Sequence, residues 1–422
     1  MFFIHWLSRV SRRSRTRESS DRSLTTSMPT RDRSKERRLK LLRLEQRRVL
    51  NADFTFVAHG LNLDHVDGDL TVREVSGSTG HRVEFDLHGG SVWQDHNSTG
   101  TFAIDNSTPG HSILSIAKPD LESLTSGVSI QAASAAFQLN FDVQSSALDL
   151  SQMQGTLAAE GFGQIHQSAA NDHDVRLGDV SLSADQITLS RFHGDDIALH
   201  ANEIDLTGGA DSFSGSTLSI LSAATHHIEL GGTNDNAHNL DFTVSDIDAL
   251  DASFHRISFE ADSADADSSI HVDSSGADFR DAITSGHDAS LHLTADSVQI
   301  DGALSISGGL IDVTATHAAT ISDTGSLVSH GGQVHVDAGD HGTLLDSGDI
   351  DVSNSEPGGI GGSVYLLGRQ VGLFGDAEVN ASGHSGGGDV LIGGDLHGDN
   401  DAIPHAAQTF IEIGRASCRE RV

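Results

Sequence analysis

Apolar and polar residues alternate in short runs along most of this 422-residue chain, and pairs of glycines separate the runs toward the C-terminus. Alternation with a period of two is typical of a β-strand that buries one face. The glycine pairs at 308–309, 331–332, 361–362 and 386–387 recur at intervals of 23, 30 and 25 residues. A repeat of this length predicts an all-β stack of coils, in which each coil covers the apolar face of the next.

The alternation also predicts which side chains face the interior of the stack. Apolar residues two positions apart are expected to point inward, and their polar neighbours outward. The inward pairs are Val334 and Val336, Ile350 and Val352, Val364 and Leu366, and Val390 and Ile392, with Gln333, His335, Asp337, Asp351 and Ser363 outward.

Similar short runs, broken by Gly, Asp, Asn and Ser, fill the chain upstream of the glycine pairs. Val180, Ile187, Ile197 and Ile204 begin runs that are 7, 10 and 7 residues apart. This spacing is short for hairpins and predicts successive sides of a triangular coil. One helical turn is expected at 246–250, because Asp and Ser favour the start of a helix.

Composition fits a narrow interior better than a broad globular core. Only 36% of the residues are hydrophobic and 5% are aromatic. Such a polar chain is also compatible with disorder, but it has only 5 prolines and its alternation persists. The single cysteine, Cys418, excludes an internal disulfide, which a stack of mutually supporting coils does not require.

Charge divides the chain sharply. Residues 1–50 carry 15 basic and 5 acidic residues, whereas residues 51–413 carry 8 basic and 54 acidic ones, a net charge of −46. A body this acidic repels phosphate backbones, so we expect no nucleic-acid partner. The 25 histidines would offset much of this charge near about pH 5.

Residues 1–51 form a basic arm that ends in a candidate amphipathic helix at 39–50, where apolar residues recur at helical spacing between Arg and Lys. Two interpretations stay open: a solvated, partly helical arm, or a targeting element that contacts a membrane or the export machinery. The apolar run 1–7 is too short for a standard secretory signal. No run reaches the ~18–20 apolar residues of a membrane-spanning helix.

Residues 44–52, Leu-Glu-Gln-Arg-Arg-Val-Leu-Asn-Ala, resemble the N-terminal motif of large planctomycete surface and secreted proteins. That motif is commonly Leu-Glu-Pro-Arg-x-Leu-Leu, and it lies between a basic arm and an extracellular repeat region. This chain has Gln46 in place of the Pro and Val49 in place of the first closing Leu. The resemblance implies export or sorting, not catalysis.

A second resemblance, to the repeats of filamentous-haemagglutinin-like exoproteins, is specific over residues 300–413 and looser upstream. It rests on residues 361–368, 371–377 and 380–395, which read GGSVYLLG, VGLFGDA and NASGHSGGGDVLIGGD. Residues 228–233, IELGGT, resemble another repeat type of the same proteins.

These exoproteins are right-handed parallel β-helices. The resemblance therefore implies a right-handed parallel β-helix over residues 52–413, with the continuity of residues 52–220 left open. It also implies an extracellular or cell-surface location and a role in adhesion or scaffolding.

The last nine residues, 414–422, break the acidic, glycine-rich pattern and carry the sole cysteine. They resemble translated adapter sequence. This predicts that they are an artefact and that the chain is the N-terminal part of a longer polypeptide. The alternative is a natural basic tail.

Carboxylates are so abundant that groups of them arise by chance. Asp195 with Asp196, and the group Asp262, Asp265 and Asp267, offer the oxygen ligands that Ca²⁺ takes. A solvated acidic face is the simpler interpretation of both groups.

The histidines do not form a tight set of zinc ligands in the sequence. His226 and His227 are adjacent, and His81, His88 and His96 are scattered. We therefore expect ordinary surface residues at these positions.

Three glycine-rich segments imitate functional motifs. Residues 208–211 are only a fragment of a calcium-binding repeat, because the full Gly-Gly-x-Gly-x-Asp register is missing. Residues 383–387 fit Gly-x-Ser-x-Gly, and residues 358–362 superficially suggest a phosphate loop. Both motifs need a helix to follow, so turns are the better interpretation.

These patterns together predict a non-enzymatic, exported or cell-surface repeat protein without catalytic, cofactor-binding or metal-binding residues. Its expected partner is an extracellular surface, a carbohydrate or a protein. One alternative is a carbohydrate-active β-helix hydrolase or lyase, which needs a cleft with three or more carboxylates and aromatics such as Trp93 or Tyr365. The other is a calcium-binding extracellular repeat protein, which calcium would stabilise.

Overall fold

The computed structural model describes residues 51–78, 80–168, 173–223, 226–234, 239–261, 267–284, 288–395, 400, 403–412 and 417–419. The chain divides into two units, Met1–Arg48 and Val49–Val422, and the described residues all belong to the second. The structure is all-β, with 56% strand and 3% helix, which confirms the predicted class. The predicted basic arm and its helix at 39–50 lie outside the described residues.

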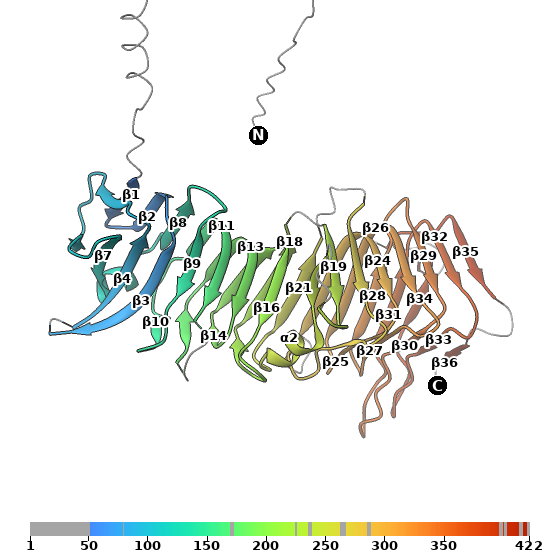
Figure 1. The fold of residues 1–422 in the computed structure, drawn as a ribbon. Coiled ribbons are helices and arrows are strands. Elements are labelled where there is room, and N and C mark those ends of the chain that lie inside the picture. The colour runs from blue at the N-terminus through green and yellow to red at the C-terminus, as the bar shows by residue number, and fades with distance from the viewer. Residues whose placement is uncertain are drawn as a thin grey trace, which may run out of the picture. The chain divides into compact units, whose positions relative to one another are not determined.

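Parallel strands dominate the second unit and lie side by side in Figure 1. The strands form a 26-stranded sheet, a 4-stranded sheet and a 6-stranded sheet. We use the word coil for the stretch of chain between two residues that pair in adjacent parallel strands. In the large sheet the strands after residue 120 are β8 (Val128–Ala132), β9 (Gln138–Phe141), β11 (Leu157–Gln167), β13 (Val180–Leu189), β15 (Asp196–Ala201), β16 (Glu203–Leu206), β18 (Thr217–Ser222), β19 (His227–Leu230), β20 (Leu240–Phe242), β21 (Arg256–Glu260), β22 (Ser269–Val272), β24 (Ser290–Ile300), β26 (Leu310–Ile321), β28 (Gln333–Asp337), β29 (Thr343–Asp346), β31 (Ser363–Leu367), β32 (Gln370–Leu373), β34 (Val390–Ile392) and β35 (Gln408–Ile411).

The two smaller sheets are also parallel. Their strands are β10 (Leu148–Leu150), β12 (Val175–Leu177), β14 (Phe192–His193) and β17 (Phe213–Ser214) in one, and β23 (Ala277–Asp278), β25 (Ala303–Ile306), β27 (Ser326–Ser329), β30 (Asp349–Asp351), β33 (Glu378–Asn380) and β36 (Ser417–Arg419) in the other. β36 belongs to the tail that was expected to break the pattern, and its backbone pairs with β33.

One column of aliphatic side chains runs through the large sheet in continuous register. Each member pairs in parallel with the equivalent residue of the next strand, about 4.8 Å away, and so covers the member before it. Members from Leu61 to Val364 are at most 2% exposed. The column consists of Leu61, Val128, Leu157, Val180, Ile197, Leu218, Ile257, Leu291, Ile311, Val334, Val364 and Val390.

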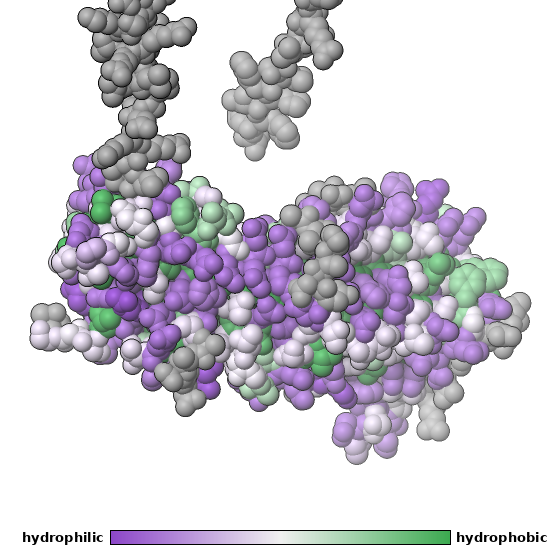
Figure 2. All heavy atoms as spheres, viewed as in Figure 1, coloured by the Kyte–Doolittle hydropathy of each residue, from purple (hydrophilic) through white to green (hydrophobic). Residues whose placement is uncertain are grey.

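The predicted inward and outward faces are confirmed where the stack continues on both sides. The first three predicted inward pairs are fully buried, and the five predicted outward residues are exposed or half-buried. Val390 and Ile392 are only half-buried, on β34. Figure 2 shows a largely hydrophilic visible face, with a hydrophobic area near β34 and β35, where Phe410 and Ile411 are exposed.

The glycine pairs mark the coil length, as predicted. The column members Ile311, Val334, Val364 and Val390 each follow one of the glycine pairs closely, so coil and glycine pair repeat together. Gly309 shows why the glycine is needed. Its φ is +89°, and an added Cβ would lie 2.3 Å from the carbonyl oxygen of Ala289 in the neighbouring coil.

The N-terminal part of the body differs from the expected parallel helix. Its strands are β1 (Asn51–Val57), β2 (Gly60–Val66), β3 (Leu70–Gly77), β4 (Gly80–His88), β5 (Val92–Asp95), β6 (Phe102–Asp105) and β7 (His111–Ala117).

Here β1–β2, β3–β4, β4–β7 and β6–β7 are antiparallel. The reason is connection length. Only Ala58 and His59 join β1 to β2, and so short a loop permits a hairpin but no parallel crossover. Because β2 and β3 also pair in parallel with β8 and β9, this antiparallel layer covers the first parallel coil and is continuous with it.

Of the four strand starts predicted at 180–204, one is wrong. Ile187 lies inside β13, which Val180 begins, and so does not begin a strand of its own. Val180 pairs with Ile197, and Ile187 pairs with Ile204, so one complete coil leads from Val180 to Ile197. The alternation breaks within β13, where Asp185 and Gln186 separate the buried Ala184 from the buried Ile187, and the partner of β13 changes there from β15 to β16.

The two described helices are short. α1 (Lys118–Glu122) was not predicted and has a proline in its first turn. α2 (Val244–Ala249) confirms the predicted helical turn but begins slightly earlier, because Thr243 is the residue that caps it.

A column of aromatic rings fills part of the interior beside the 4-stranded sheet. Phe213 is fully buried, and its ring stacks between Phe192, with centroids 5.7 Å apart, and Phe254, with centroids 6.2 Å apart. Phe141 extends the column, 6.3 Å from Phe192. These rings supply apolar volume where the short strands carry few residues.

Phe213→Ala is expected to lower the free energy of unfolding by about 3–5 kcal/mol, because it leaves a cavity between two rings. Thermal unfolding followed by circular dichroism measures the loss. The matched control is Phe410→Ala, since Phe410 is 55% exposed and the same truncation there should cost about 0.5 kcal/mol or less. Equal losses in the two variants would contradict the importance of the ring column.

Asp346 lies in the apolar interior although its side chain is a carboxylic acid. It is inaccessible to solvent and in register with Ile321 and Leu373. One carboxyl oxygen accepts a hydrogen bond from the backbone N of Gly348 at 3.1 Å, and the other has no hydrogen-bond partner. Burial raises the pKa of Asp346 to about 7.

The folded state therefore keeps this proton up to about pH 7, whereas the unfolded chain releases it near about pH 4. The stability of the folded state consequently falls as the pH rises between these values. Asp346→Asn removes that dependence, so its stability relative to the parent should increase with pH, by up to about 4 kcal/mol above pH 7. Thermal midpoints across this range measure the gain, which the exposed control Asp323→Asn should not show.

Candidate functional site

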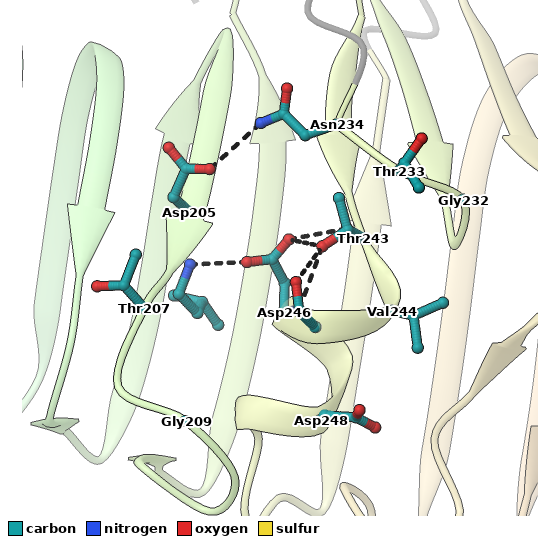
Figure 3. Close-up of a pocket in the computed structure, with 12 residues that line it drawn as sticks. Asp205, Thr207, Gly209, Gly232, Thr233, Asn234, Thr243, Val244, Asp246 and Asp248 are labelled. Atoms are coloured by element: carbon teal, nitrogen blue, oxygen red, sulfur yellow. Dashed lines mark hydrogen bonds between the residues drawn. The ribbon is translucent and has the colours of Figure 1, made fainter.

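A pocket of about 650 Å³ opens beside the longest coil between β8 and β34 (Figure 3). Leu218 and Ile257 are register partners, although all of residues 219–256 separate them in the sequence. β19 pairs with β22 of the next coil, and the additional residues between β19 and β21 form β20 and α2. The pocket lies between the end of β16, the loop after β19 and the start of α2, so an insertion creates it while Leu218 and Ile257 stay in register.

Asp246 connects α2 to β16 at this pocket, as the dashed lines in Figure 3 show. One carboxyl oxygen accepts from the backbone N of Leu206 at 2.7 Å. The other accepts from the backbone N of Thr243 at 2.8 Å and from its hydroxyl at 2.6 Å. Burial raises the pKa of Asp246, against these hydrogen bonds, which lower it. These hydrogen bonds fix the start of α2 and tie it to the end of β16.

A second group of carboxylates lies along β16. The side-chain N of Asn234 donates to Glu203 at 2.5 Å and to Asp205 at 3.3 Å, and Figure 3 shows it directed at Asp205 from the loop. Burial, followed by repulsion from Asp205 and Asp241, raises the pKa of Glu203 to about 7. This carboxyl group can therefore gain or lose a proton near neutral pH.

The pocket meets half of the requirement for a carbohydrate-active site. Asp205, Asp246 and Asp248 line it, but none of its described lining residues is aromatic. Trp93 is buried, and Tyr365 lies on β31 beside His335, in a different part of the fold. The recess therefore offers polar groups and, beside it, one acid that titrates near neutrality.

The structure describes three of the five carboxylates that the sequence suggested for calcium, Asp195, Asp196 and Asp267. Asp196 is exposed on β15 and accepts a hydrogen bond from the Thr217 hydroxyl at 2.7 Å. Asp262 and Asp265 lie outside the described residues, so the group that they were expected to form with Asp267 stays a prediction.

Most of the histidines that were considered as zinc ligands each contact a different polar group. His227 lies 2.8 Å from the Ser269 hydroxyl, His81 lies 2.6 Å from a Glu74 oxygen, and His96 lies 3.1 Å from an Asp53 oxygen. His226, next to His227, has a φ of +54°. His88 is different, because the structure places it beside Asp86 and His111.

The cluster Asp86, His88 and His111 was missed by the sequence reasoning. Of the described residues, only these three form a group of potential metal ligands with all ligand atoms within 4.8 Å of one another. The spacing of Asp86 and His88, two apart on one strand, was a partial signal. Nothing local indicated His111, which reaches them through the pairing of β4 with β7.

The glycine segments are turns, as predicted. Residues 358–362 are followed by β31 and residues 383–387 by β34, so neither is followed by a helix. Isolated bridges join Asn354 to Gly383 and Ile360 to Gly386, which stacks one turn on the other. In segment 208–211, Gly209 lines the pocket beside α2.

No protein-family model, curated protein or solved structure matches this chain. Within the described residues, both helices fall far short of the length and apolar character that crossing a membrane requires.

Asp246→Ala is expected to lower the free energy of unfolding by about 1–3 kcal/mol, because it leaves the backbone N of Leu206 and the helix start without their acceptor. The control is Asp248→Ala, a little further along α2, where the side chain is exposed. Chemical denaturation of both variants measures the difference. An Asp248→Ala loss as large as that of Asp246→Ala would contradict the assigned role.

Proposed function

We propose that this protein is an exported or cell-surface structural protein with an adhesin-like or scaffold role. In this proposal its body winds as a right-handed parallel β-helix of the filamentous-haemagglutinin-like kind. It is not an enzyme, and it presents its coils to an extracellular surface, a carbohydrate or another protein.

The observation that supports this proposal best is the continuous parallel register from Leu61 to Val390. A chain that repeats one small coil many times builds a long, regular surface and few enclosed cavities. Such a surface suits multiple weak contacts along its length better than the chemistry of one centre.

The outer face supports the same conclusion. Polar side chains repeat along this face, and some of them form hydrogen bonds between neighbouring coils. For example, the side-chain amide of Gln164 donates to the side-chain oxygen of Gln186 at 3.1 Å. The acidic charge of residues 51–413 keeps such a surface hydrated and soluble at high local concentration. We assign the export function to the basic arm, through the motif at 44–52 and its contact with a membrane or the export machinery.

Epitope-tagged full-length protein, expressed in a planctomycete host, is expected at the cell surface, where antibody labels intact cells. Replacing Leu44, Val49 and Leu50 together by Ser should abolish surface labelling and leave the total amount of protein unchanged. Leu24→Ser, in the same arm but outside the motif, is the control and should be labelled normally.

Protein that stays in the cytoplasm, or labelling that is unaffected by the motif variant, would contradict the proposed export. The non-catalytic part is tested separately with purified protein and soluble polysaccharides. Sugar release that Glu203→Gln abolishes would overturn it and favour a hydrolase at the pocket beside α2.

A further inference from the structure

We propose that Asp86, His88 and His111 form a binding site for a divalent transition-metal ion, with zinc as the best-fitting ion. The three residues lie on the outer face of the antiparallel layer formed by β3, β4 and β7. His88 and His111 are direct cross-strand partners, and Asp86 lies two positions before His88 on the same face.

The distances within this cluster suit a shared ion. Nδ1 of His111 lies 3.0 Å from one oxygen of Asp86, and Nε2 of His88 lies 3.8 Å from the other. Zinc bonds of about 2.0–2.1 Å in a tetrahedron place ligand atoms about 3.3 Å apart. The ligand atoms of the three residues all lie within 4.8 Å of one another, so side-chain shifts of at most about 1.5 Å bring them to this spacing around one ion.

Burial sets this cluster apart from the other acidic groups on the surface. The side chain of Asp86 is only 5% exposed although its strand position faces outward. The imidazole rings of His88 and His111 pack against each other with centroids 4.5 Å apart. Two imidazoles and one carboxylate, held on rigid strands, form a ligand set that binds transition metals in preference to calcium.

Neighbouring side chains hold the ligands in place. A guanidinium N of Arg73 lies 3.5 Å from one oxygen of Asp86, which leaves the oxygen nearer His111 to face the ion. The Thr71 hydroxyl lies 3.3 Å from Nε2 of His88 and must turn away when that nitrogen binds metal. Outer contacts like that of Arg73 with Asp86 orient metal ligands in proteins. Three protein ligands leave a fourth position for water.

The site would join β4 to β7 within the layer that covers the first parallel coil. Metal bound only by the folded state must stabilise that state. We therefore expect zinc to raise the thermal midpoint of unfolding, because all three of its protein ligands belong to this layer.

The test uses the full chain, freed of metal with a chelator that is then removed, and titrated with Zn²⁺ by calorimetry. Co²⁺ absorption reports the coordination geometry. One tight zinc site per chain is expected. His88→Ala or His111→Ala should lower the zinc affinity at least about 100-fold, because the loss of even an outer contact lowers metal affinity about 10–100-fold. His96→Ala and His81→Ala are matched controls, because these histidines pair with carboxylates outside the cluster.

Loss of the tight site in the controls, or its retention in both cluster variants, would overturn the proposal. Circular dichroism without metal shows whether each variant folds. If His111→Ala unfolds, His111→Asn tests the same ligand with a side chain that still bonds to Asp86. A tetrahedral Co²⁺ spectrum in the parent that His111→Asn abolishes supports the site, and an octahedral spectrum that it leaves unchanged opposes it.

Discussion

The in-register stacking of aliphatic side chains constrains what the rest of this molecule can vary. Ile257 is covered by Leu218 on one side and by Leu291 on the other, so its burial depends on both neighbours. A shift by a single position within a strand would turn the apolar face outward. Length therefore varies mainly between strands, from the short coil that joins Val180 to Ile197 to the long one that leads from Leu218 to Ile257. The pocket beside α2 exists because the register tolerates that insertion.

The same stacking acts on the outer face, where equivalent side chains of successive coils are also neighbours and like charges would repel. Asp312 lies between two histidines, with Nδ1 of His292 at 3.0 Å and Nδ1 of His335 at 2.8 Å. Burial opposes ionisation of Asp312, but these hydrogen bonds outweigh it and hold its pKa below the ordinary range. The bond to Asp312 in turn raises the pKa of His335. At this position an acid between two histidines avoids the repulsion that stacked acids would have.

The sequence indicated the core better than the sites, and the difference is physical. Alternation and glycine spacing are local, so they identify inward residues without knowledge of the pairing. His111 meets His88 only through the register of an antiparallel strand pair, and Asn234 reaches Glu203 from a distant loop. Asp346 was not predicted to be buried, because a carboxylate at an inward position breaks the very pattern on which the prediction depends.

The antiparallel layer at the N-terminal end shows how this fold is stabilised where stacking begins. An end coil lacks one neighbour, and its strand edge would otherwise be free to pair with another chain. Basic residues are scarce in the acidic body, yet Arg73, Arg82 and Lys118 all lie in or directly after this layer. Arg73 pairs with Glu84 at 2.8 Å, and Lys118 lies 3.4 Å from Glu74. At this end of the stack, cross-strand polar contacts on the outer face therefore add to the stability that the buried apolar residues of the layer supply.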